Sequence, residues 1–229
     1  GLVLWQYSVN DGAIDYLAEG ESVTETFTLL LVDDLGGETS KEVTVTITGK
    51  NDGPEIVVAS PGAVITELEN GEAGEDTVNH AASGTVEFSD SDLSDSHSIS
   101  VTPPSGPRGA LTATLSASAT GVVEWNYVVS DGALDDLAEG QIIVESFILN
   151  IDDGHGGIVS TAVNVTLTGT NDAPVIIGQT EAMFDEDQQT AVINLLSNAS
   201  DADGDVLSIQ SATVTVGDGR QLAYSLDQV

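Results

Sequence analysis

The chain has 229 residues, 40% of them apolar, and 38 Asp and Glu face only 4 Lys and Arg, which gives a formal net charge of -34. A surface of that sign repels nucleic acid and anionic lipid, so we expect no nucleic-acid partner and no membrane insertion by this segment. Because the chain contains no cysteine, a disulfide framework, thiolate metal sites and cysteine nucleophiles are excluded.

The acidic residues would also repel one another. Two carboxylates about 5 Å apart at an effective dielectric near 20 repel by roughly 3 kcal/mol. Repeated over several clusters, that repulsion would be hard for a modest core to tolerate. The acids are therefore either spread and solvated, or they bind cations.

The first element in the chain is a repeat. Residues 1–54 align with residues 121–174 without a gap at an offset of 120, and 28 of those 54 positions are identical. A period of that length suits a small domain repeated in tandem rather than the coil of a solenoid. Since residues 1–12 begin within a strand pattern, we expect the chain to be a segment of a longer protein.

The alternation of residues along the chain predicts β-strands. Small apolar residues alternate with threonine or other polar residues, and β-branched residues dominate, over 41–49, 109–118, 160–169 and 211–216. Turn signals separate these stretches at Asp11-Gly12, Gly36-Gly37, Pro103-Pro104, Asp131-Gly132 and Gly156-Gly157. Short strands with frequent turns favour an antiparallel β-sandwich, and the fold class is predicted to be all-β. Helix-like character is expected only at the two LAEG corners (17–20 and 137–140) and over 192–200.

The joint Asn-Asp-x-Pro closes both copies of the repeat, at 51–54 and 171–174. If these are joints between domains, residues 1–50 supply the last strands of a preceding sandwich and residues 51–170 form a complete one. Residues 171–229 then supply the front strands of a following sandwich. A chain in this phase leaves open sheet edges at both ends, which is an aggregation hazard.

The repeated motifs resemble the VCBS repeat of large, RTX-type bacterial surface adhesins. The blocks that carry the resemblance are W-x-Y-x-V-x-D-G-A-x-x-x-L-A-E-G, F-x-L-x-x-x-D-x-x-G-G and V-x-V-T-x-T-G-x-N-D-x-P, at 5–20, 27–54, 125–140 and 147–174. The tail at 184–209 is similar to the opening of a bacterial cadherin-like repeat.

The resemblance implies tandem cadherin-like (Ig-like) Greek-key β-sandwiches joined end to end, with Ca²⁺ at the joints and no enzymatic activity. It also implies an extracellular or bacterial cell-surface location and a role in cell adhesion and biofilm. The implied partners are neighbouring repeats of the same chain, and a host-cell or abiotic surface reached through other domains.

Candidate calcium ligands gather in the loops that such a fold brings to each joint. At the first joint they are Glu19, Asn51, Asp52, Asp90, Asp92, Asp152 and Asp153. At the second they are Glu67, Glu69, Glu139, Asn171, Asp172, Asp201, Asp203 and Asp205. Hard oxygen ligands in a flexible cage indicate calcium rather than zinc or magnesium. The alternative for each residue is a solvated turn acid, since Asp favours turns without any metal.

Two other functions stay open at this stage. One sandwich could be a ligand-binding head for a glycan or peptide, and the insert at 102–109 is its candidate loop. An enzyme is disfavoured because the chain has no nucleophile elbow or His-Glu-x-x-His motif.

An EF-hand is rejected because Val206 and Ala212 stand where the loop starting at Asp201 needs Gly and an acid. Aromatic residues make up only 4% of the chain, and Trp5 and Trp125, like Tyr7 and Tyr127, occupy repeat-equivalent strand positions that predict core packing.

Overall fold

The computed structural model describes residues 2–60, 62–117, 121–178, 181, 183 and 193–211. Its elements in chain order are η1 (Asp11–Ala13), β1 (Ser22–Val32), β2 (Glu38–Thr48), β3 (Glu55–Ala59), β4 (Ala63–Thr66), β5 (Asn79–Ser89), β6 (Ser98–Thr102), β7 (Ala110–Leu115), β8 (Val122–Ser130), η2 (Asp131–Ala133), β9 (Ile142–Asp152), β10 (Ile158–Thr168), β11 (Val175–Ile176) and β12 (Ala199–Ser200). Within these ranges, no helix has the length and apolar character needed to cross a membrane.

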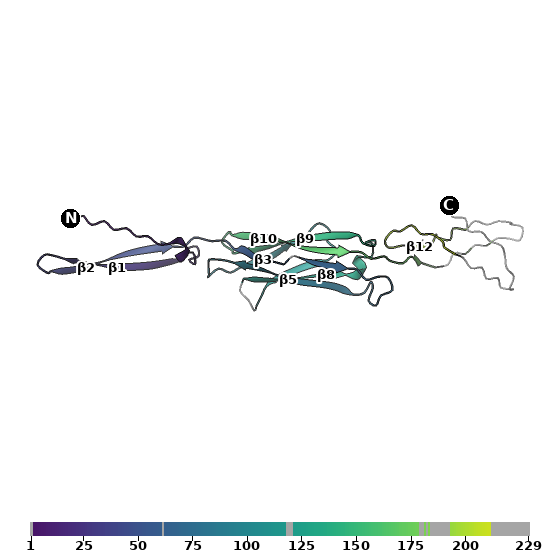
Figure 1. The fold of residues 1–229 in the computed structure, drawn as a ribbon, viewed down its shortest axis with the longest axis horizontal. Helices are drawn as coiled ribbons and strands as arrows, with labels where there is room; N and C mark the ends of the chain where they lie inside the picture. The colour runs from purple at the N-terminus through teal and green to yellow at the C-terminus, as the bar shows by residue number, and fades with distance from the viewer. Residues whose placement is uncertain are drawn as a thin grey trace. The chain divides into compact units, whose positions relative to one another are not determined.

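Eight strands form two four-stranded sheets. One has the order β3-β5-β8-β7 and the other the order β4-β10-β9-β6 (Figure 1). Taken in chain order, these are the A-B-E-D and A′-G-F-C sheets of the immunoglobulin-type sandwich, with its Greek-key connections. The fold class is therefore all-β, as the alternation of residues predicted.

The core lies between these sheets and follows the period of two. In β8, Val123, Trp125, Tyr127 and Val129 are buried while the residues between them are more exposed. In β9 the buried positions are Glu145, Phe147, Leu149 and Ile151. The rings of Tyr127 and Phe147 meet edge-to-face at 5.7 Å between centroids, which joins the two layers.

The remaining strands form two small sheets. β1 pairs antiparallel with β2 from Ser22↔Thr48 to Val32↔Glu38, and this hairpin is a sheet of its own (Figure 1). β11 pairs with β12. β1 and β2 are the repeat equivalents of β9 and β10, so equivalent strand pairs form a two-stranded sheet in one copy and half of a four-stranded sheet in the other.

Three of the four predicted strand stretches are confirmed, in β2, β7 and β10. The fourth, at 211–216, lies outside the described residues except for its first position. The prediction of helix at the LAEG corners is wrong, because the short 3₁₀ helices precede the corners at Asp11 and Asp131. The corner itself is a turn in which Glu21 N–H donates to the Ala18 carbonyl over 3.0 Å and Gly20 has φ +82°. Residues 195–198 also form a turn, not a helix.

The chain divides into two compact units. The first comprises residues 1–63, 81–128 and 144–165, and the second comprises residues 64–80, 129–143 and 166–229. Each Asn-Asp joint lies inside a unit: Asn51-Asp52 in the first and Asn171-Asp172 in the second. Each joint is thus packed together with the loops of its own unit. The domain limits after residues 50 and 170 stay a prediction.

Candidate metal sites at the two Asn-Asp joints

The first joint is held by carboxylates from loops distant in sequence. The N–H of Asp52 donates to Oδ2 of Asp92 over 2.8 Å, and the side-chain amide of Asn51 donates to Oδ2 of Asp153 over 3.0 Å. Asp92 is in turn placed by Asp90, whose Oδ1 accepts its N–H over 2.9 Å. We call Asn51, Asp52, Asp90, Asp92 and Asp153, together with Asp95, the first acidic cluster.

Asp153 organises the loop that follows β9. Its carboxylate is buried and accepts the N–H groups of His155 (2.7 Å) and Gly157 (3.0 Å) in addition to Asn51. Burial alone would raise the pKa of Asp153, but these hydrogen bonds outweigh it and lower that pKa. The carboxylate is therefore ionised and aimed at the joint.

Asp95 completes a group of three that the sequence did not single out. Carboxylate oxygens of Asp90, Asp95 and Asp153 lie within 4.8 Å of one another. Two of these carboxylates each contact a histidine: His97 Nε2 lies 2.9 Å from Asp90 Oδ2, and His155 Nδ1 lies 3.2 Å from Asp95 Oδ2. The negative charge of Asp95 raises the pKa of His155.

Acids of the preceding repeat also act on the first joint. Burial raises the pKa of Asp52, and the charges of Asp92, Asp15 and Asp11 raise it further. Asp11 and Asp15 lie in and beside η1, so the charges of carboxylates on both sides of the joint act on Asp52.

The second joint carries a corresponding set, which we call the second acidic cluster: Glu67, Asp76, Asp131, Asp135, Asp172 and Asp203. Oxygens of Glu67, Asp135 and Asp172 lie within 4.8 Å of one another. Oε2 of the buried Glu67 accepts the N–H of Thr170 over 2.8 Å. Burial and the neighbouring charges of Asp172 and Asp135 raise the pKa of Glu67 to about 7 despite that hydrogen bond. Burial and a side-chain contact with Asp76 raise the pKa of Asp135 to about 6.

Asp131 fixes the loops on which this cluster lies. It is fully buried, and it accepts the N–H of Leu68 and the N–H of Asp76, each over 3.0 Å. His80 Nε2 lies 2.6 Å from its Oδ1. Burial alone would raise the pKa of Asp131, but these partners lower it. A single buried carboxylate thus ties the segment after β4 and the segment before β5 to η2.

The loop DADGD approaches the second joint as the loop DSD approaches the first. The N–H of Asp172 donates to Oδ2 of Asp203 over 2.8 Å, which repeats the bond between Asp52 and Asp92. The oxygens of Asp201, Asp203 and Asp205 lie within 4.8 Å of one another. Burial raises the pKa of Asp172, and the charge of Asp203 raises it further.

Four buried oxygens at the joints have no hydrogen-bond partner within the described part of the chain: Asn51 Oδ1, Glu67 Oε1, Asp92 Oδ1 and Asp203 Oδ1. Buried polar atoms are nearly always paired, so an orphaned carboxylate oxygen calls for another partner. All four are hard oxygen donors among further carboxylates, which is the donor set that Ca²⁺ takes. The residues present therefore fit a divalent cation at each joint.

The remaining predicted ligands are half-buried or exposed, unlike the buried carboxylates described above. Asp152 is half-buried and accepts the N–H of Gly154 over 2.7 Å. The side-chain amide of Asn171 donates to the carbonyl of Asp172 over 3.0 Å. The last three, Glu19, Glu69 and Glu139, are exposed and belong to none of the groups of three carboxylates found among the described residues.

Sequence reasoning missed Asp76, Asp95, Asp131 and Asp135. For two of them a signal existed: the spacing D-G-A-x-D is identical in both copies, at Asp11 and Asp15 and at Asp131 and Asp135. The other two lie outside the repeated blocks.

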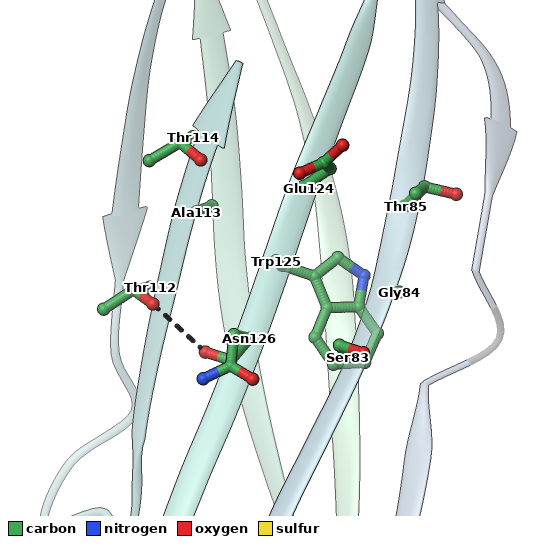
Figure 2. Close-up of a pocket in the computed structure, with 9 residues that line it drawn as sticks. All are labelled: Ser83, Gly84, Thr85, Thr112, Ala113, Thr114, Glu124, Trp125 and Asn126. Atoms are coloured by element: carbon green, nitrogen blue, oxygen red, sulfur yellow. Dashed lines mark hydrogen bonds between the residues drawn. The ribbon is translucent and has the colours of Figure 1, made fainter. Parts of the chain in front are cut away.

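A hollow of about 420 Å³ on the sheet β3-β5-β8-β7 is unrelated to these clusters. Its lining includes Thr112, Thr114 and Asn126, and the indole of Trp125 lies beneath it (Figure 2). None of the predicted site residues lines it. The insert at 102–109 ends on Gly109 against the ring of Tyr127, so its last residues support the core.

A family model described as a cadherin-like domain matches residues 170–224. The matched stretch includes the second joint and the loop that holds Asp201, Asp203 and Asp205. No curated protein matches the chain. The narrower resemblance to VCBS repeats of RTX-type adhesins stays a prediction.

Several solved structures resemble the chain in part. They include human CDH23 EC21-23 (17% identity, TM-score 0.34, covering 78% of this chain and 54% of that one). They also include cadherin-like domains 1 to 4 of zebrafish RET (13% identity, TM-score 0.32, covering 66% of this chain and 34% of that one). Domains 4 and 5 of the S-layer protein SbsC align at 16% identity and TM-score 0.33, covering 63% and 70%. The chain thus spans about a third of the zebrafish chain and about half of the human one.

Proposed function

We propose that this chain is a structural segment of a large bacterial surface or secreted adhesin of the RTX type. In this proposal its VCBS-like and cadherin-like sandwiches form a tandem array, and Ca²⁺ binds at the joints and makes them rigid. The observation that carries the proposal is the convergence of Glu67, Asp135 and Asp172, with one buried Glu67 oxygen left unpaired. The limits of the units are proposed at residues 50 and 170.

The mutual repulsion of these three carboxylates favours a bound cation at the second joint. Three carboxylates within 4.8 Å of one another repel by roughly 3 kcal/mol for each ionised pair at an effective dielectric near 20. Burial is the main cause of the raised pKa values of Glu67 and Asp135, and the neighbouring carboxylates, including Asp76 beside Asp135, raise them further. A divalent cation would reverse the sign of these interactions, so that the same residues would stabilise the joint.

The donor set favours calcium over other divalent cations. The chain contains no cysteine, and the clusters offer carboxylate and amide oxygens, which suit a hard ion with six to eight ligands. Extracellular modules bind Ca²⁺ with dissociation constants near 10⁻⁴–10⁻³ M. At ten times that concentration each site adds only about 1.4 kcal/mol, so several sites must act on one joint.

The position of the acidic clusters explains how a bound calcium ion would make each joint stiffer. Asp92 and Asp203 already hold the peptide N–H of Asp52 and Asp172, and Pro54 and Pro174 restrict φ two residues later. A cation shared between the joint and both neighbouring sets of loops would fix the chain direction there. Neighbouring repeats are thus the partners of this segment, and the attachment to a surface is assigned to other domains.

The test is a calcium titration of the full chain after removal of divalent ions. We expect calorimetry to detect binding and the melting temperature to rise with Ca²⁺ more than with the same concentration of Mg²⁺. Glu67→Gln and Asp92→Asn should weaken the response, whereas Glu87→Gln, an exposed acid on β5, should leave it unchanged. A melting curve that is the same in calcium and in EDTA would contradict the proposal.

A further inference from the structure

Four strands lie at the edges of the sandwich, β3 and β7 in one sheet and β4 and β6 in the other. Three of them carry features that oppose pairing with another strand. β3 contains Glu55 and has a register shift between Ile56 and Val58. β4 has only four residues, and β6 has five and is followed by Pro103-Pro104. Short strands, bulges, charges and prolines are the means by which natural sheets block an open edge.

The fourth edge strand, β7, has none of these features. It has six residues and pairs with β8 without a register shift, from Ala110↔Val128 to Leu115↔Val123. It contains no charged residue and no proline, although the whole chain has a formal net charge of -34. Among the described residues, the sheet order gives β7 no second neighbour. An open, regular and uncharged edge is suited to the addition of another strand.

The hydrogen bonds to β8 identify the backbone groups of β7 that face the open edge. The N–H of Ser116 donates to the carbonyl of Val122 over 2.8 Å. Because hydrogen-bonded pairs alternate along an antiparallel ladder, the even-numbered residues of β7 direct their N–H and carbonyl groups to β8. The same groups of Leu111, Ala113 and Leu115 therefore point away from β8. These three residues are spaced evenly about Ala113.

We infer that the open edge of β7 pairs antiparallel with β7 of a second copy of this chain, about a two-fold axis at Ala113. In this register Ala113 lies opposite Ala113 of the second copy, and Leu111 lies opposite Leu115. Each of the three residues then exchanges both of its edge hydrogen bonds with the other strand. The contact is isologous, since the same residues of both copies form it.

The side chains of β7 also match one another in this register. Leu115 is 40% exposed at the edge of the sheet, and it would lie beside the buried Leu111 of the second copy. On the outer face Thr112 would lie opposite Thr114 of the second copy, and threonine pairs across strands are favourable. Figure 2 shows both threonines on β7, next to Asn126 and Glu124 of β8.

The charge of the chain favours this edge for contact between two copies. Each copy has a formal charge of -34, so most contacts between copies would bring carboxylates together. From Gly109 to Val123 the sequence has no charged residue, and two β7 strands can therefore meet without a carboxylate between them. We expect a weak dimer, because six residues at an edge bury less than the roughly 800 Å² per partner of a standard interface.

Cysteine cross-linking tests the register, because the chain contains no cysteine of its own. Thr112 and Thr114 of the two copies would form a non-hydrogen-bonded pair with Cα atoms about 4.5 Å apart, which suits a disulfide. Two copies of the same threonine would lie about 8 Å apart, too far for one. A mixture of Thr112→Cys and Thr114→Cys chains should therefore cross-link at least about tenfold faster than either variant alone. Thr85→Cys, exposed on β5, is the matched control and should gain nothing from mixing with either.

Sedimentation at increasing chain concentration tests the association itself. Ala113→Pro removes an N–H that does not bond to β8, and the two-fold symmetry makes this one substitution remove two hydrogen bonds. We expect the association constant to fall at least about tenfold, whereas Ala113→Ser keeps the N–H and should behave as the unmodified chain. Higher salt should strengthen the dimer, because the Debye length falls from about 10 Å at about 0.1 M to about 3 Å at about 1 M.

Three results would overturn the inference. The first is a chain that stays monomeric up to millimolar concentration at high salt. The second is cross-linking that is as fast in the single variants as in the mixture, a result that stands even where Ala113→Pro does not fold. The third is a dimer that Ala113→Pro leaves unchanged, which would mean that another surface joins the copies. All measurements are made in EDTA, so they do not depend on the proposed calcium binding.

Discussion

The peptide N–H of Asp52 lies 2.8 Å from Oδ2 of Asp92, forty residues further along the chain. The same bond, with the same length, joins Asp172 to Asp203 at the second joint. In both places the acceptor is the second Asp of an Asp-x-Asp loop and the donor is the Asp of an Asn-Asp joint. The repetition shows that the two joints are held by the same backbone-to-carboxylate hydrogen bond.

Replacing Asp92 by Ala should loosen the first joint. The substitution leaves the N–H of Asp52 without its acceptor, and the loss of a hydrogen bond to a charged group costs about 1.5–3 kcal/mol. We expect the Asp52 amide to exchange at least about tenfold faster, as measured by NMR, because 1.4 kcal/mol corresponds to a factor of ten. Asp34→Ala, in an exposed turn, is the control, and equal exchange rates in the two variants would show that Asp92 does not hold the joint.

Replacing Glu67 by Gln should have opposite effects with and without calcium. At pH 8 the buried carboxylate, whose pKa is raised to about 7, is mostly ionised and unfavourable, so its neutral isostere should stabilise the calcium-free protein by on the order of 1–3 kcal/mol. The added stability from Ca²⁺ should shrink at the same time. Denaturation by urea in EDTA and in calcium gives both numbers. A variant that is less stable in EDTA and unchanged in its calcium response would contradict this account of Glu67.

The calcium-free protein should lose stability as the pH rises from about 4 to 7. Glu67 and Asp135 have folded-state pKa values of about 7 and about 6, above their ordinary values of 4.5 and 3.8. In this window the folded state binds more protons than the unfolded state, so the free energy of unfolding falls with pH. Asp131 and Asp153 act in the opposite sense, since their lowered pKa values add stability that is lost only as acid protonates them.

Urea midpoints measured in EDTA between pH 3 and 8 would test this. We expect a maximum near pH 4 to 5 and a decline toward pH 7, and saturating calcium should abolish the decline. Stability that rises steadily to pH 7 in EDTA would mean that Glu67 and Asp135 are not strained in the calcium-free state.

Short sequence motifs pointed to the Asn-Asp joints and the Asp-x-Asp loops, but not to the other acidic residues that lie beside them. Asn51-Asp52, Asn171-Asp172 and the Asp-x-Asp loops stand out because each is a short local motif, two of them repeated at an offset of 120. Asp76 and Asp95 carry no local motif. Their roles depend on where loops return in the fold, and Asp131, for example, meets Asp76 across 55 positions and Leu68 across 63. Contacts between residues so far apart in the sequence are determined by the folded sandwich, and no short stretch of sequence predicts them.

Replacing Asp131 by Asn should be costly, and the repeat supplies its control. The buried carboxylate accepts hydrogen bonds from Leu68 N–H and Asp76 N–H and contacts His80. An amide replaces one acceptor oxygen by a donor, so at least one of these groups would be left unpaired in the interior. Because breaking a buried charged network costs about 3–5 kcal/mol, we expect a loss in that range.

The equivalent substitution in the first copy, Asp11→Asn, should cost less than about 0.5 kcal/mol, as exposed substitutions usually do. Asp11 is exposed, and the alignment of residues 1–54 with 121–174 gives Leu68, Asp76 and His80 no counterpart. Urea denaturation of both variants in EDTA compares the same chemical change in the two settings. Equal losses would mean that the sequence of the η turn itself, and not the loops tied to Asp131, determines the stability at this position.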